Sequence, residues 1–235
     1  MCGRFVITSA PDAIRRLFGY ASTPNFPPRY NIAPTQPVPT VAVVAGNRHF
    51  QLMRWGLIPA WAKDPAKIGL LINARAETVL EKPSFRNAMR YRRCLVPADG
   101  YYEWHRRGGR NQPLFVHPAE GGPMAFAGLA ETWIGPNGEE MDTVAIVTTA
   151  ASDDLAAFHP RMPAVIASDA FASWLDVIGT STTEAMALLA PAPAGTFRWH
   201  PVSSAVNQVA NDNAELIVPA AEEQPRPEAQ LKLFE

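Results

Sequence analysis

The chain has 235 residues, of which 47% are hydrophobic, and its formal net charge at pH 7 is −1. Such a composition is typical of a globular protein with a buried core, and two cysteines are too few for a disulfide framework or a four-thiolate zinc site. Because no apolar run approaches the ~20 residues that span a bilayer, and because no signal peptide is recognisable, we expect a cytoplasmic protein without membrane, metal or cofactor.

Short helices and strands follow one another irregularly along the chain. A first helix is predicted at residues 8–19, capped by Thr8 or Ser9 and ended by Gly19. A proline-dense, extended segment follows, and then two strands around a Gly-Asn turn at 40–56. Further strands are predicted at 93–118, 123–133, 142–150 and 196–203, and further helices at 82–93, 168–177 and 181–190.

This order predicts the fold class and the domain boundary. Many short strands without regular βαβ alternation indicate an α+β fold around a mostly antiparallel sheet, and no internal repeat is present. No break in composition precedes residue 212, so residues 1–211 are expected to form one domain. Residues 212–235, rich in proline, glutamate and alanine, are expected to be a disordered tail.

Cys2 is the most unusual feature of the N-terminus. Methionine aminopeptidases usually remove Met1 before a small residue, which leaves Cys2 with a free α-amine and a thiol on adjacent carbons. Both groups are partly available as nucleophiles near neutral pH. The amine can condense with an aldehyde, and the thiol can then close a five-membered thiazolidine ring. Alternatively, the thiolate can attack an amide while the amine acts as the base.

Positive charge is concentrated in the middle of the chain. Residues 48–110 carry 13 Lys and Arg against 5 Asp and Glu, whereas residues 212–235 carry 2 against 6. Arginines outnumber lysines by 17 to 4, and arginine forks suit phosphate oxygens. A codon bias explains the arginine excess equally well, but not its position.

Three polar residues stand in motifs that suit either catalysis or structure. Asn73 in "NARAET" offers a neutral donor and acceptor, or it caps a turn. Glu103 in "DGYYEW" lies among aromatic residues, which suits proton transfer, or it is an exposed edge glutamate. His159 in "FHPRMP" precedes a proline, so it is extended, and it suits proton transfer or packing in the core.

Six blocks together resemble a known family: "MCGRF", "RYNIAPTQ", "RWGLIPAWAKD", "NARAET", "CLVPADGYYEW" and "HPRMPAVI". They closely resemble the SOS-response-associated peptidase (SRAP) family, whose members sense abasic sites in single-stranded DNA. The resemblance runs from Met1 to about Asn211 in the family's order and spacing. It implies a single α+β domain around a twisted, mostly antiparallel sheet or barrel with peripheral helices.

The resemblance also implies roles for individual residues. Cys2 would form a thiazolidine with the ring-opened aldehyde of an abasic site and so shield the lesion, with weak lyase and autopeptidase activity besides. Asn73 would hold the amine or a sugar hydroxyl, Glu103 would be the acid/base partner of Cys2, and His159 would transfer protons during ring opening and reversal. Phosphate contacts are implied for Arg4, Arg75 and Arg161 and, on a looser match, Arg86.

Two tryptophans flank "GLIPA" and could stack on exposed bases. Trp61 is the better candidate for stacking, whereas a place in the core is the stronger interpretation for Trp55. The family often has another aromatic residue after Trp61, but this chain has Ala62 there. Part of the expected stacking platform is therefore missing.

Two other classes of function compete with the one that the resemblance implies. An N-terminal-nucleophile amidohydrolase would also begin with Cys-Gly, but the Arg-Gly-x-Asp stretch of glutamine amidotransferase domains is absent. In a non-catalytic module for single-stranded DNA, Cys2 would be incidental. The favoured interpretation is a DNA-repair protein of the cytoplasm, associated with the nucleoid.

The last residues, "QLKLFE", carry a separate signal. They resemble the short peptide by which bacterial repair and replication proteins bind the sliding clamp. Two leucines and a phenylalanine would fill an apolar groove while the glutamine orients the peptide. The alternative is an end that packs back on the domain. The positions concerned are Gln230, Leu231, Leu233 and Phe234.

Overall fold

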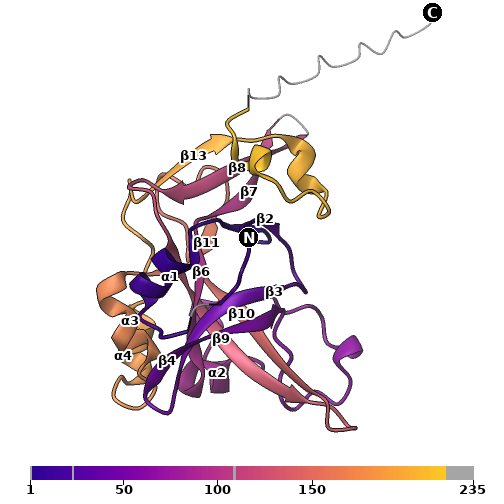
Figure 1. Ribbon diagram of the computed structural model, residues 1–235, viewed down its shortest axis with the longest axis vertical. Coiled ribbons are helices and arrows are strands. Elements are labelled where there is room, and N and C mark those ends of the chain that lie inside the picture. Colours follow the sequence, from indigo (N-terminus) through magenta and orange to yellow (C-terminus); the bar gives the residue numbers. More distant parts are fainter. Residues whose placement is uncertain (1, 23, 108–109, 221–235) are drawn as a thin grey trace, which may run out of the picture.

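The fold consists of two β-sheets with short helices around them (Figure 1). The computed structural model describes residues 2–22, 24–107 and 110–220. The peptide at 230–234 therefore lies outside the described residues. The predicted α+β class with a mostly antiparallel sheet is confirmed.

Five strands of the larger sheet close into a barrel. β10, β4, β3, β6 and β9 pair in this order, and β9 pairs again with β10. The pairings of β10 with β4 and with β5 are parallel, and the other pairings in this sheet are antiparallel. Its described strands are β3 (Pro37–Val44), β4 (Asn47–Trp55), β5 (Asn73–Arg75), β6 (Arg93–Ala98), β9 (Met124–Ile134), β10 (Glu140–Ala150), β11 (Arg161–Pro163) and β12 (Val165–Ile166).

The smaller sheet lies above the barrel in Figure 1 and is antiparallel throughout. Its strands follow the order β13-β8-β7-β1-β2. β7 comes almost directly after β6, so the chain passes from one sheet to the other near Asp99. The strands are β1 (Phe5–Ile7), β2 (Arg29–Ile32), β7 (Gly100–Arg107), β8 (Arg110–Pro118) and β13 (Phe197–Pro201).

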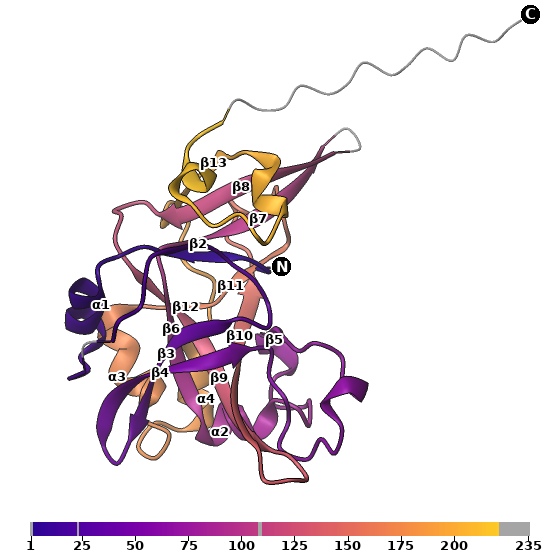
Figure 2. The same cartoon turned by 45° about the vertical axis from the view of Figure 1, so that its right-hand side comes forward.

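Helices cover the outside of the two sheets, with α1, α3 and α4 on one side and α2 below the barrel (Figures 1 and 2). The α-helices are α1 (Pro11–Phe18), α2 (Arg86–Tyr91), α3 (Phe171–Leu175) and α4 (Thr182–Ala187). The 3-10 helices are η1 (Pro65–Lys67), η2 (Ala76–Thr78), η3 (Ser168–Ala170), η4 (Ser204–Asn207) and η5 (Ala214–Ile217).

The first helix confirms one sequence-based expectation and corrects another. It ends as predicted at Gly19, whose φ of 70° is the left-handed conformation that glycine adopts at little cost. Thr8 and Ser9 do not cap it, because the helix begins after Ala10 and the hydroxyl and backbone N–H groups of Thr8 and Ser9 donate to the carboxylate of Asp99 instead. These bonds tie the end of β1 to the crossing between the sheets, so the two polar side chains serve tertiary structure instead.

Phe5 joins the smaller sheet to the barrel. Its ring lies edge-on to Trp55 of β4, with centroids 5.2 Å apart, and to Phe126 of β9, at 5.9 Å. All three side chains are fully buried. Edge-to-face pairs of this kind contribute about 0.5–1.5 kcal/mol each beyond the burial of apolar area. The start of the chain is therefore held inside the molecule rather than on its surface.

The expected boundary at residue 211 is too early. Asp212 accepts hydrogen bonds from the backbone N–H groups of Tyr30 and Asn31, and Leu216 of η5 is 2% exposed. Composition suggested a disordered tail because it averages over charged neighbours, whereas one buried leucine and one paired aspartate suffice to order this turn. The folded part therefore extends to residue 220. Among the described residues, no helix is long and apolar enough to cross a membrane.

Cys94 is a buried structural thiol. It is fully buried on β6 and faces Gly128 of β9, where a Cβ atom would lie only 2.6 Å from the Cys94 sulfur. Any larger residue at position 128 would therefore collide with the thiol. Burial raises the pKa of the Cys94 thiol from 9.0 to about 12.

This shift predicts how stability depends on pH. Because the folded-state pKa lies above the unfolded one, the stabilisation by protonated Cys94 is complete below about pH 8.5 and is lost as the pH rises toward 12. Above pH ~9, the free energy of unfolding should therefore fall less steeply with pH in Cys94→Ala than in the parent. The two slopes should differ by up to about 1.4 kcal/mol per pH unit. Urea unfolding of both proteins between pH 7 and 10.5 measures this, and equal slopes would contradict it.

Candidate functional site

Cys2 lies fully buried beside strands of both sheets. The side-chain amide of Asn73 donates a hydrogen bond to the carbonyl oxygen of Cys2 over 2.9 Å. The Cys2 thiol donates a weak hydrogen bond to the carbonyl of Arg4 over 3.8 Å. Burial, and then the negative charge of Glu103, raise the pKa of the Cys2 thiol well above its usual value. The thiol is therefore protonated at neutral pH, and it needs a proton acceptor when it attacks.

Asn73 comes to Cys2 through the parallel pairing of β5 with β10, in which it lies opposite Ile146. Its amide nitrogen donates to the carbonyl of Cys2, while its Oδ1 atom is buried and has no hydrogen-bond partner among the described residues. A buried carbonyl oxygen of this kind is costly unless something donates to it. The Asn73 side chain can therefore accept a hydrogen bond from an amine or a hydroxyl close to Cys2.

Glu103 is not an exposed edge glutamate, because it is only 7% exposed. It points to the same face of β7 as Tyr101, which pairs with Phe5 of β1. Burial, and then the charges of Cys2 and Glu103, raise the pKa of the Tyr101 phenol well above its usual value. Tyr101 thus belongs to the same group. The alternation of "YYEW" already placed it on the face of Glu103, although sequence reasoning gave it no role.

His159 stands at the end of a loop that leads into β11. Its Nδ1 atom lies 3.0 Å from the backbone nitrogen of Arg161 and 3.1 Å from the carbonyl oxygen of the same residue, so the backbone of Arg161 fixes the orientation of the ring. The preceding residue, Phe158, packs edge-on against His105 of β7, with ring centroids 5.1 Å apart. His105 shares a face of β7 with Glu103. This contact brings the loop before His159 to the face of the smaller sheet that carries Glu103.

Arg161 is engaged by a carboxylate rather than open on both sides. Its two terminal nitrogens each lie 3.0 Å from an oxygen of Glu77, and it also donates to the hydroxyl and carbonyl of Thr148. The hydrogen bond from Arg161 holds the pKa of Glu77 below its usual value. A phosphate at Arg161 would have to share this guanidinium with Glu77 or displace it.

The other three arginines predicted to contact phosphate differ in setting. Arg75 follows Asn73 on β5 and is exposed, close to the Glu77–Arg161 pair. Arg4 is partly buried, and burial lowers the pKa of its guanidinium. Arg86 opens α2, and both views place this helix below the barrel, away from the N-terminus (Figures 1 and 2). The structure does not bring Arg86 to the group around Cys2.

The two tryptophans lie in different environments, one in the core and one on the surface. Trp55 is fully buried and its indole N–H donates to the carbonyl of Ile72, so it is a core residue and cannot stack on a base. Trp61 is 57% exposed and remains a candidate. Ala62 is buried, and its carbonyl accepts a hydrogen bond from the Trp133 indole over 2.7 Å. A second stacking ring at position 62 would displace that contact.

Two other features of the described residues are not part of this site. A surface hollow of about 850 Å³ lies between the β3–β4 hairpin and α3 and is lined by none of the predicted site residues. No group of three or more His, Cys, Asp or Glu side chains in the described part of the chain could hold a metal ion.

One protein family and several individual proteins are similar to this chain. The sequence profile of the family described as "SOS response associated peptidase (SRAP)" matches residues 1–209. The abasic site processing protein YoaM of Bacillus subtilis is 39% identical over 222 residues, which cover 92% of this chain and 97% of that protein. The abasic site processing protein YedK of Escherichia coli is 34% identical, covering 93% of this chain and 100% of YedK.

Solved structures have the same fold. A crystal structure of a Bacteroides thetaiotaomicron protein superposes with a TM-score of 0.84 and covers 94% of this chain and all of its own, at 24% identity. A protein from Bordetella bronchiseptica superposes with a TM-score of 0.75, covers 86% of this chain and all of its own, and is 25% identical. With Cys2, Asn73 and Glu103 gathered at its N-terminal strand, the chain belongs to the SOS response associated peptidase family.

Proposed function

We propose that this chain senses abasic sites in single-stranded DNA and binds them covalently through Cys2. The observation that carries the proposal is the setting of Cys2, which is buried with Asn73 bonded to its carbonyl and with Glu103 beside its thiol. The relatives named as abasic site processing proteins support the same substrate.

The proposed reaction has two steps that balance in atoms and protons. After removal of Met1, the α-amine of Cys2 condenses with the C1′ aldehyde of the ring-opened sugar to form an imine and releases one water. The sulfur then adds to the imine carbon, and the thiol proton ends on the nitrogen. The resulting thiazolidine cannot eliminate, so the lesion is shielded. An imine that does not close permits β-elimination, which accounts for weak lyase activity, and the autopeptidase activity would remove what precedes Cys2.

Glu103 and His159 have separate roles in the proposal. Burial and Glu103 keep the Cys2 thiol protonated, so the thiol needs a base before its sulfur can attack. In the proposal Glu103 is this base: it accepts the thiol proton and returns it to the nitrogen. His159 transfers protons to and from the sugar during ring opening and reversal. Asn73 accepts a hydrogen bond from the amine or from a sugar hydroxyl through its buried Oδ1 atom.

A denaturing gel of the purified protein with a single-stranded oligonucleotide that carries one abasic site tests the reaction. We expect a shifted band that survives denaturation, none with Cys2→Ala, and with Cys2→Ser at most a band that requires borohydride reduction. Cys94→Ala is the matched control and should crosslink like the parent. A stable crosslink by Cys2→Ala would overturn the proposal. Glutaminase activity would support an amidohydrolase, and a salt-sensitive shift that detergent abolishes would support a non-catalytic module.

The acid/base roles predict slower chemistry without loss of binding. Glu103→Gln should slow crosslink formation, and His159→Ala should slow the exchange of one crosslinked strand for another, each by roughly tenfold or more, because positioned proton transfer contributes about 10²–10⁴ in rate. Quenched time courses on denaturing gels measure both rates. The exposed His49 on β4 is the control, since His49→Ala should change neither rate. Parental rates in both site variants would refute the assignment.

Binding before crosslinking should depend on salt and on strandedness. If several phosphates are contacted, affinity for an intact single strand should fall roughly tenfold or more between 50 and 200 mM salt, and intact duplex should bind more weakly. Arg75→Gln should flatten the slope of log affinity against log salt by about 0.7, the value for one phosphate of a single strand. Arg16→Gln, exposed on α1, should leave it unchanged. Fluorescence anisotropy decides, and equal affinity for duplex would count against this picture.

The C-terminal peptide supports a second, independent proposal about recruitment. Residues 230–234 lie outside the described residues, so the argument rests on sequence alone: two leucines and a phenylalanine would anchor the peptide in the groove of a bacterial sliding clamp. Truncation after Ala229 should abolish clamp binding in isothermal titration and leave crosslinking to free oligonucleotides unchanged. Leu233→Ala in the full chain is the matched point variant. If the intact protein does not bind, or both proteins bind equally, the peptide has no such role.

A further inference from the structure

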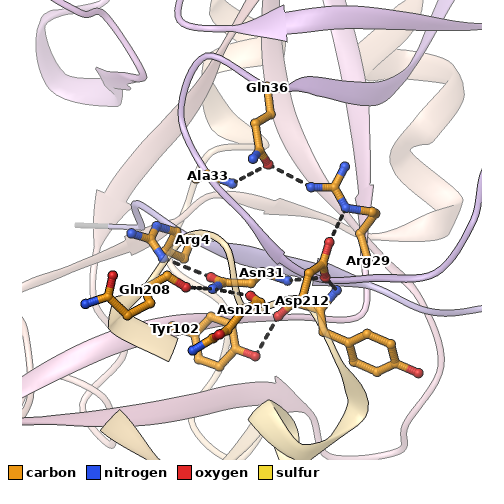
Figure 3. Close-up of polar contacts among 10 residues, drawn as sticks. Arg4, Arg29, Asn31, Ala33, Gln36, Tyr102, Gln208, Asn211 and Asp212 are labelled. Carbon is orange, nitrogen blue, oxygen red and sulfur yellow. Dashed lines mark hydrogen bonds and ion pairs between the residues drawn. The ribbon is translucent and has the colours of Figure 1, made fainter. Parts of the chain in front are cut away.

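Asn31 of β2 is fully buried and uses both ends of its side-chain amide (Figure 3). Its Nδ2 atom donates to three backbone carbonyls of the segment 206–211, which begins within η4: those of Val206 and Gln208 at 3.1 Å and that of Asn211 at 2.8 Å. Its Oδ1 atom accepts a hydrogen bond from Nη1 of Arg4 over 2.9 Å. Asn31 therefore joins the first strand to the last folded segment of the chain.

Arg4 is bound to this network through one nitrogen only. Nη1 donates to Asn31 and to the carbonyl of Val206, each over 2.9 Å, which uses both of its hydrogens. Among the contacts of the described residues, Nε and Nη2 of Arg4 donate no hydrogen bond. A guanidinium has five N–H donors, so three remain. They lie on the Nε–Nη2 edge, which is the fork that binds a phosphate with two parallel hydrogen bonds.

The acceptor that holds Arg4 is neutral, and this matters for its charge. Arg161 and Arg29 are paired with the carboxylates of Glu77 and Asp212, which offset their positive charge. Asn31 orients Arg4 without neutralising it. Arg4 is also two residues from Cys2, and its carbonyl accepts the weak hydrogen bond of the Cys2 thiol. The backbone of Arg4 is therefore in contact with Cys2.

We infer that Asn31 is a positioning residue for DNA: it fixes Nη1 of Arg4 so that the Nε–Nη2 edge, still fully charged, receives a phosphate of the strand next to Cys2. The inference deepens the proposed function, on which it rests for the identity of the strand. It also makes the segment 206–211, which closes the network behind Asn31, part of the DNA site although no side chain of it need touch DNA.

A double-mutant cycle on an intact single-stranded oligonucleotide tests the inference, because no crosslink can form there. Arg4→Gln should flatten the slope of log affinity against log salt by about 0.7. The ratio of parental to variant affinity should therefore be roughly 2.6 times smaller at 200 mM salt than at 50 mM. Asn31→Ala should flatten the slope equally, and it should cost no further affinity in the Arg4→Gln background. An unchanged slope in Arg4→Gln, or additive losses in the double variant, would overturn the inference.

Two further variants separate positioning from mere stability. Asp212→Ala loosens the same network, since Asp212 accepts from Arg29 and from the backbone of Asn31, but it leaves the acceptor of Arg4 in place. It should lower the melting temperature and keep the parental salt slope. Asn31→Asp keeps an acceptor for Arg4 but offsets its charge, so it should flatten the slope, while the loss of the three Nδ2 hydrogen bonds lowers its melting temperature. If neither Asn31 variant folds, the slope of Arg4→Gln alone decides whether Arg4 binds a phosphate. If the parent binds with this slope but does not crosslink abasic DNA, the proposed function fails and the positioning role stands.

Discussion

The burial of the N-terminal strand between two sheets is the constraint on which the site depends. Phe5 packs against Trp55 and Phe126 of the barrel, while β1 pairs with β7 and β2 in the smaller sheet. A chain terminus is usually free to move because few contacts hold it. Here the rings of Phe5 and its neighbours fix the backbone three residues from Cys2. Cys2 is therefore held in a defined geometry close to Asn73 and Glu103.

The same burial determines the electrostatics around the thiol. Taking Cys2 out of water and placing Glu103 beside it raises the pKa of the thiol, so the nucleophile is stored in its protonated form. A protonated thiol is a poor nucleophile toward chance electrophiles. Under the proposed mechanism, a neighbouring base must remove this proton before the sulfur attacks.

The arginines near the site are held in two different ways. Glu77 accepts hydrogen bonds from both terminal nitrogens of Arg161 and offsets its charge, whereas the neutral Asn31 accepts a hydrogen bond from only one nitrogen of Arg4. A carboxylate partner must be shared or displaced before a phosphate can bind, while an amide partner leaves the charge available. A phosphate at Arg4 would therefore meet a guanidinium whose charge Asn31 does not offset, whereas a phosphate at Arg161 would compete with Glu77.

The sequence by itself determined the family, the α+β class, most of the elements and the importance of Cys2, because short motifs and local periodicity carry that information. Only the resemblance linked Asn73 and Glu103 to Cys2, since 71 and 101 residues separate them from it along the chain. The structure places both residues near Cys2, and their roles in the reaction stay predictions.

Only the tertiary structure decided the partners of each side chain. Trp55 and Trp61 look alike in "RWGLIPAWAKD", yet one is in the core and the other is exposed, because packing depends on what the barrel brings opposite each residue. Asn31 carried no signal beyond its place in "RYNIAPTQ", and its role emerged when a segment 175 residues away supplied three carbonyls. Such long-range hydrogen bonds leave no periodic trace in a sequence, since each depends on how two distant segments meet.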